Sequence, residues 1–97
     1  MDTQFQDLQW VIDRCVIQFK REPNRRISSL FRDLRKNTHF SLLGDYGILW
    51  AIAKTMDMLN MKRIRNQFGT AARQSPEFRE LPKREKMMWL ENFTGDI

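Results

Sequence analysis

The fold is decided by residues 46–60, which read YGILWAIAKTMDMLN. They are apolar almost all the way round a helix, with Lys54 and Asp57 as the charged exceptions. A helix that is apolar on every side has to be covered by other elements. We therefore expect this segment to be the central helix of a bundle. Its longest apolar run, residues 48–53, is far shorter than the ~20 residues that a membrane-spanning helix needs, so we expect no membrane contact.

Apolar residues at helical spacing precede the central segment. Residues 3–20 are predicted as a helix whose core side is formed by Leu8, Ile12, Cys15 and Phe19. Pro23 ends this pattern because proline cannot continue the helical hydrogen bonds, and Asn24 is expected to be the N-cap of the next helix. That second helix is predicted over about residues 25–36. Its core side comprises Ile27, Leu30, Phe31 and Leu34.

Helical patterns also follow the central segment. Residues 62–73 are predicted as its continuation or as a separate helix, with Ile64, Phe68 and Ala71 facing inward. Ser75 and Pro76 start one short turn before Pro82, and the last helix is predicted over about residues 83–93. No segment alternates as a strand would. The 97 residues are therefore predicted to form one all-α domain, a compact bundle of four to five helices.

Basic residues are concentrated in two segments. The chain carries +5 at pH 7, but residues 20–36 alone hold seven basic and two acidic side chains, and residues 62–74 hold four basic and no acidic ones. Such clustering raises the local potential more than the net charge indicates. It also has a purely structural explanation, since Arg and Lys are good helix formers and outward helix faces are usually charged. Both interpretations stay open.

Uncharged hydrogen-bonding groups are interleaved with these cations, as in surfaces that contact phosphates and sugars. On the second helix, cations and one hydroxyl recur at i, i+4, i+7 and i+11, opposite the core side. The series is Arg25, Ser29, Arg32 and Lys36. The candidates in the later segment are Lys62, Arg63, Asn66 and Arg73. We predict that these eight residues bind nucleic acid, which requires the two basic faces to be contiguous.

The form of nucleic acid is suggested by what the sequence lacks. Residues 53–68 make a poor helix-turn-helix, because Asp57 or Met58 stands where the turn prefers Gly and Arg63 stands where an inward apolar residue is expected. Binding through backbone charge and shape needs only a basic groove with some stacking groups. We therefore favour a single strand or a structured RNA over sequence-specific reading of a duplex.

Two patches of the sequence resemble segments in the all-helical small subunits of CRISPR surveillance complexes. The first is Asn24-Arg25-Arg26-Ile27 with Leu30-Phe31-Arg32, and the second is Lys83-Arg84-Glu85-Lys86 with Leu90-Glu91-Asn92-Phe93. Members of that family use basic helical faces to hold a nucleic-acid strand along a filament of like subunits. The resemblance implies this role for Arg25, Arg32 and Lys36.

Catalytic or metal-binding machinery is not apparent in the sequence. One Cys and one His, at positions 15 and 39, do not make a zinc site, and a single Cys cannot close an intrachain disulfide. Cys15 is predicted to be a buried, inert thiol and His39 a loop residue. We expect no enzyme activity, no cofactor and no bound metal. The cysteine usage, together with a start that lacks a basic and then apolar run, indicates a cytoplasmic, reducing compartment.

Large apolar side chains also occur on the polar side of the predicted helices. Trp10 and Ile17 are seven residues apart opposite the core side of the first helix, and Met88 points away from the core residues of the last. Such groups often mark contacts with another protein chain or a second copy, so all three are predicted interface residues, although Trp10 also suits a core packed on both sides. Two functions are therefore weighed. The first is non-catalytic nucleic-acid binding within a larger assembly, and the second is an adaptor or inhibitor, of viral or phage type, that docks on an acidic partner.

Overall fold

The computed structural model describes residues 3–37 and 43–94. These residues contain no strand and form α1 (Thr3–Arg21), α2 (Ile27–Lys36), α3 (Gly44–Met58), α4 (Arg65–Ala72), α5 (Pro76–Arg79) and α6 (Lys83–Thr94). The all-α prediction is confirmed. Five of these helices are longer than one turn, and α5 is the short turn predicted before Pro82. His39 lies outside the described residues.

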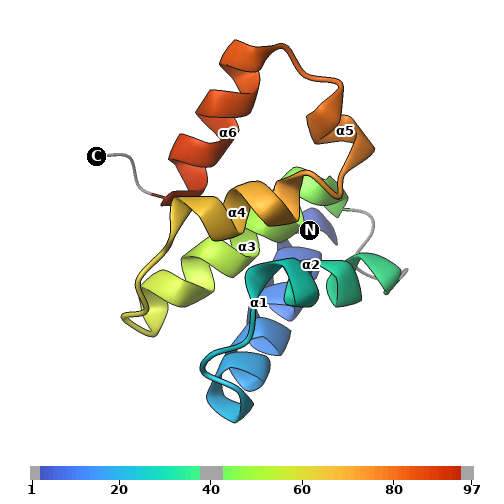
Figure 1. Cartoon of the computed structure of the whole chain (residues 1–97). Helices are drawn as coiled ribbons and strands as arrows, with labels where there is room; N and C mark the ends of the chain where they lie inside the picture. The colour runs from blue at the N-terminus through green and yellow to red at the C-terminus, as the bar shows by residue number, and fades with distance from the viewer. Residues whose placement is uncertain (1–2, 38–42, 95–97) are drawn as a thin grey trace.

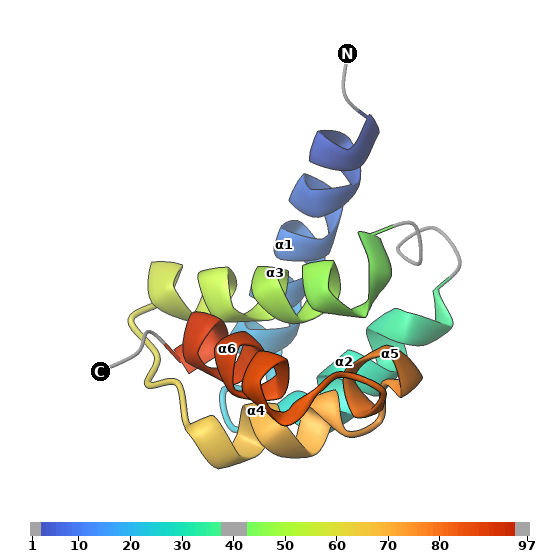
Figure 2. The same cartoon turned by 90° about the horizontal axis from the view of Figure 1, so that it is seen from above.

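The helix α3 is central, as its composition predicts. It packs against α1, α2, α4 and α6, and it buries Ile48, Leu49 and Ile52 almost completely (Figures 1 and 2). The helix α2 also packs on α4, and α4 packs on α6. Segments 20–36 and 62–74, which hold the excess positive charge, are thus brought side by side.

The turn after α3 determines where the second basic segment begins. Asn60 has a left-handed backbone with φ of 57°. Its N–H donates to the Asp57 carbonyl at 3.1 Å, and the N–H of Met61 donates to the Met56 carbonyl at 2.8 Å. This is a Schellman motif, in which asparagine takes the position that glycine usually occupies. It ends α3 and turns the chain toward α4, which begins as a separate helix at Arg65.

The helix α1 presents two different faces. Cys15 and Phe19 are buried as predicted, together with Val11, whereas Leu8 and Ile12 are half-buried. The N-terminal half of α1 extends beyond the neighbouring helices (Figure 2). Burial raises the pKa of the Cys15 thiol from 9.0 to about 12, partly offset by a hydrogen bond with Thr55. The thiol is therefore neutral in the fold.

Three local predictions are wrong. The helix α2 starts at Ile27 rather than at residue 25, because the chain first makes a turn in which the Arg25 N–H donates to the Glu22 carbonyl. Its N-cap position is Arg26 and not Asn24. Ile64 is 42% exposed rather than inward, because it lies in extended backbone just before α4.

A polar network connects the ends of several helices. Arg35 on α2 donates to Asp45 on α3 at 2.9 Å and to the Gln74 carbonyl at 3.2 Å. Asp45 also accepts from the buried hydroxyl of Ser75, the N-cap of α5. The Gln74 amide donates to the Ser28 carbonyl at 3.0 Å. The bond from Gln74 to Ser28 fixes the start of α2 against the end of α4, next to the groove described below, and Arg35 connects the last turn of α2 to the same residue.

Candidate nucleic-acid interface

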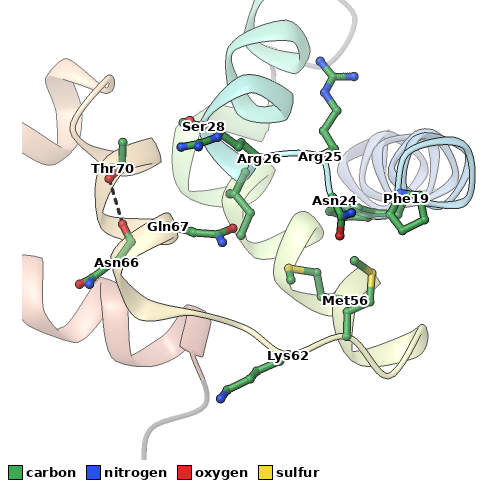
Figure 3. Close-up of a pocket in the computed structure, with 13 residues that line it drawn as sticks. Phe19, Asn24, Arg25, Arg26, Ser28, Met56, Lys62, Asn66, Gln67 and Thr70 are labelled. Atoms are coloured by element: carbon green, nitrogen blue, oxygen red, sulfur yellow. Dashed lines mark hydrogen bonds between the residues drawn. The ribbon is translucent and has the colours of Figure 1, made fainter.

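A groove of about 600 Å³ lies between the α1–α2 connection and the segment that leads into α4 (Figure 3). Phe19 and residues 23–28, which include the start of α2, form one side. Met56, the extended chain at Met61 and Lys62, and the first turns of α4 form the other. Its size is within the range of about 300–1,000 Å³ that small-molecule pockets occupy. The two basic segments therefore meet at a concave surface.

No carboxylate is among the described residues that line this groove. Arg26 and Lys62 are exposed at its edges, and neither forms an ion pair with another described residue. In Figure 3 the Lys62 ammonium points outward from the rim, toward solvent. Two uncompensated cations beside an acid-free hollow produce a locally positive potential that attracts anions.

Arg25 lines the groove but its charge is already paired. Its guanidinium donates to Gln18 at 2.6 Å and to Ser29 at 3.2 Å, and it forms an ion pair with Asp33. Only 14% of the side chain is exposed, and Figure 3 shows it turned away from Gln67 and Lys62. The expectation that Arg25 lies on a solvated helix face is wrong, because this residue precedes α2 and connects it to α1.

Three side-chain amides lie around the groove. Asn24 comes from the α1–α2 connection, and Asn66 and Gln67 come from the first turn of α4. All three are exposed, and none forms a side-chain hydrogen bond with another described residue. In Figure 3, Gln67 extends from α4 toward α2, whereas the Asn66 amide points to the opposite side of α4. Each amide therefore has a free donor group and a free acceptor group to offer a ligand.

The floor of the groove is apolar. Phe19, Ile27 and Met56 are at most 4% exposed, whereas Met61 is half-buried and Pro23 is exposed. A flat apolar group in the groove would contact Pro23 and Met61. The described lining offers no exposed aromatic ring for stacking.

Arg63 does not reach the groove. It donates to the Phe93 carbonyl at 3.0 Å and pairs with Asp57 at 3.1 Å, with 17% of its side chain exposed. Phe93 is in the last turn of α6, where carbonyls lack partners within the helix. Arg63 therefore stabilises the end of α6. The sequence around Arg63 does not indicate this contact, because Phe93 is 30 residues away along the chain.

The other predicted residues lie away from the groove. Ser29 is half-buried and accepts from Arg25. Arg32 and Lys36 are exposed and line a second hollow, of about 340 Å³, with Arg35, Asp45 and Ile48. Arg73 is exposed just beyond the end of α4. Of the eight residues predicted to bind nucleic acid, the groove brings together Arg25, Lys62 and Asn66.

Arg26, Asn24 and Gln67 line the groove but were not predicted as site residues. The helical spacing that selected Arg25 assumed that the helix begins there, and it left Arg26 out. Asn24 was assigned to capping. The feature of the sequence that could have identified Asn24 and Arg26 is the run Asn24-Arg25-Arg26 directly after Pro23. A turn at this point places consecutive side chains on different sides of the chain.

The residues predicted for a protein interface are exposed. Trp10 is 47% exposed, Ile17 48% and Met88 53%. Trp10 and Ile17 share the outer face of α1, whereas Met88 lies on α6, next to the exposed Met87. The α1 helix packs on α3, and α6 packs on α3 and α4, so these residues occupy two separate surfaces.

No helix in residues 3–37 and 43–94 is long and apolar enough to cross a membrane. Within the same ranges, no three His, Cys, Asp or Glu side chains are grouped as metal ligands. Compared with protein-family models, with curated proteins and with solved structures, the chain has no match.

Proposed function

We propose that the protein binds nucleic acid without catalysis, through the groove between the α1–α2 connection and α4. One observation carries the proposal: two segments about 40 residues apart converge on an acid-free hollow edged by Arg26 and Lys62 and surrounded by free amides. Cations supply sequence-independent attraction to phosphates, and neutral donors add contacts to phosphate and sugar oxygens.

A single strand or a structured RNA suits this site better than a duplex read through its major groove. Helix-turn-helix proteins join their two helices by a turn of three to four residues. Here residues 59–64 separate α3 from α4, and α4 is a helix of 8 residues with Phe68 and Ala71 buried against its neighbours. The connection of six residues, 59–64, is longer than that turn.

The test is the salt dependence of binding. Labelled single- and double-stranded oligonucleotides are titrated with the protein at several salt concentrations between 50 and 200 mM. Each phosphate contact contributes about −0.7 to the slope of log affinity against log salt on a single strand. The double variant Arg26→Ala/Lys62→Ala is expected to reduce the magnitude of that slope by about 1 to 1.4.

A matched control removes the same charge elsewhere. Lys83 and Arg84 are exposed on α6 and do not line the groove. The variant Lys83→Ala/Arg84→Ala is expected to keep the slope of the original protein, because neither side chain lines the groove. Equal slopes for both double variants, or no salt-dependent binding by the original protein, would refute the proposal.

The second candidate function is that of a protein-interaction adaptor or inhibitor, and the exposure of Trp10 and Ile17 on one face of α1 favours it. Large exposed apolar groups often mark contacts with another chain. The two functions are compatible in a nucleoprotein assembly, where one surface binds the strand and another binds a neighbouring subunit. The resemblance to CRISPR small subunits describes such an assembly and stays a prediction.

A further inference from the structure

We infer that the groove holds an unpaired base of a single strand, and that the amides of Asn24 and Gln67 contact the edge of that base. This inference rests on the proposed function and deepens it. The cations explain attraction to any polyanion. They do not explain why free amides and an apolar floor occupy the space between them.

The amides are the first argument. Several of the other described amides are engaged, since Gln74 donates to the Ser28 carbonyl, Gln9 to Asp13 and Asn92 to Tyr46, although the exposed Asn60 amide forms no side-chain hydrogen bond within the described residues. The amides around the groove have no such partner among the described residues. An amide offers a donor and an acceptor side by side, which matches the paired donor and acceptor on the edge of a base.

The shape and the floor are the second argument. A groove of about 600 Å³ is large enough for a ligand of nucleotide size. Its floor exposes apolar surface of Pro23 and Met61, against which the face of a base can lie. Single strands present such unstacked bases, and proteins read them by their edges.

The positions of the cations are the third argument. Arg26 stands on the α2 side of the groove and Lys62 on the opposite rim. A strand that crosses the groove places a base between them and its phosphates outside, near the two charges. The base would then contact the amides while the backbone stays in solvent.

The experiment measures the affinity of the protein for a single-stranded oligonucleotide and for an abasic strand of equal length and charge. The comparison is made with both DNA and RNA strands. We expect the intact strand to bind about tenfold more tightly, the effect of one well-placed pair of hydrogen bonds to a base. The variant Asn24→Ala/Gln67→Ala is expected to remove this advantage. Its salt slope should equal that of the original protein, because no cation is lost.

The control is Gln9→Ala, which removes an exposed amide on α1 far from the groove lining and should keep the tenfold advantage. Circular dichroism of each variant verifies that the helices are intact. Equal affinity for intact and abasic strands, with a salt slope that still depends on Arg26 and Lys62, would overturn the base pocket and leave the proposed function standing. Absence of salt-dependent binding to either strand would overturn both.

Discussion

Two neighbouring basic residues, Lys62 and Arg63, are expected to respond to the same substitution in opposite ways. Lys62 is exposed at the rim of the groove and has no ion pair within the described residues. Arg63 connects two helix ends, since it pairs with Asp57 in the last turn of α3 and donates to the Phe93 carbonyl in the last turn of α6. The side chains differ in environment and not in charge.

The magnitudes follow from these contacts. A hydrogen bond from a charged donor contributes about 1.5–3 kcal/mol, and a cation near a helix C-terminus is favourable. The pair with Asp57 adds little, because that carboxylate is 43% exposed. Arg63→Ala should therefore lower the free energy of unfolding by about 2 kcal/mol, which corresponds to a fall in Tm of about 8–16 °C for a domain of this size. Lys62→Ala should change stability by less than about 0.5 kcal/mol.

The assay pairs thermal unfolding with the salt titration. Lys62→Ala is expected to flatten the salt slope on a single strand by about 0.7 and to keep the Tm. Arg63→Ala is expected to lower the Tm and, measured well below its Tm, to keep the slope. Arg63→Lys should recover part of the stability, because a point charge replaces the guanidinium but cannot reproduce both contacts. An unchanged Tm for Arg63→Ala together with a flatter slope would refute the assignment of Arg63 to the fold.

Three further outcomes are expected. Trp10→Ala should keep the helicity and lower the Tm only a little, since Trp10 is 47% exposed. It should weaken self-association or partner binding, which light scattering measures. Unfolding of the variant would place Trp10 in the core. The raised pKa of Cys15 means that the folded state retains its proton between pH 9.0 and about 12 while the unfolded state loses it. The free energy of unfolding should therefore fall with rising pH in that range, by up to about 1.4 kcal/mol per pH unit. Urea unfolding at several pH values measures this fall, and Cys15→Ala should remove the contribution of the thiol. Identical pH profiles for the two proteins would contradict the burial argument. Asp45→Ala should cost about 2–4 kcal/mol, because Arg35 and the buried Ser75 both lose their acceptor, and chemical unfolding measures it.

The apolar pattern of the sequence predicted most of the core, although it missed Val11 and placed the exposed Ile64 inside. An all-round apolar segment becomes the central helix because no other placement removes so much apolar surface from water. Ser75 and Pro76 likewise predicted the start of α5, where the Ser75 hydroxyl accepts from the Phe78 N–H at 3.3 Å. In these places, local chemistry and the packing of the whole chain favour the same structure.

The site was predictable only in part. Arg25 and Arg63 resemble solvated cations in the sequence, but their partners Gln18, Asp33 and Phe93 come from other helices or from the far side of a turn. Helical spacing cannot reveal such contacts, because they depend on how the helices pack. The start of α2 was predicted two residues too early, at residue 25 instead of Ile27. Because of this error, Arg25 and not Arg26 was predicted to bind nucleic acid.

The two candidate functions use surfaces that mutations can separate. Phe19 lines the groove, while Trp10 lies nine residues earlier on α1, which is about 13 Å along the helix axis. Substitutions at Trp10 should therefore leave the base pocket intact, and substitutions at Gln67 should leave the α1 face intact. If the protein is a subunit of a nucleoprotein assembly, loss of Trp10 should reduce cooperative binding along a long strand while affinity for an oligonucleotide that fits one groove is unchanged. If it is an adaptor alone, the Trp10 variant loses its partner and nucleic-acid binding is absent from the start.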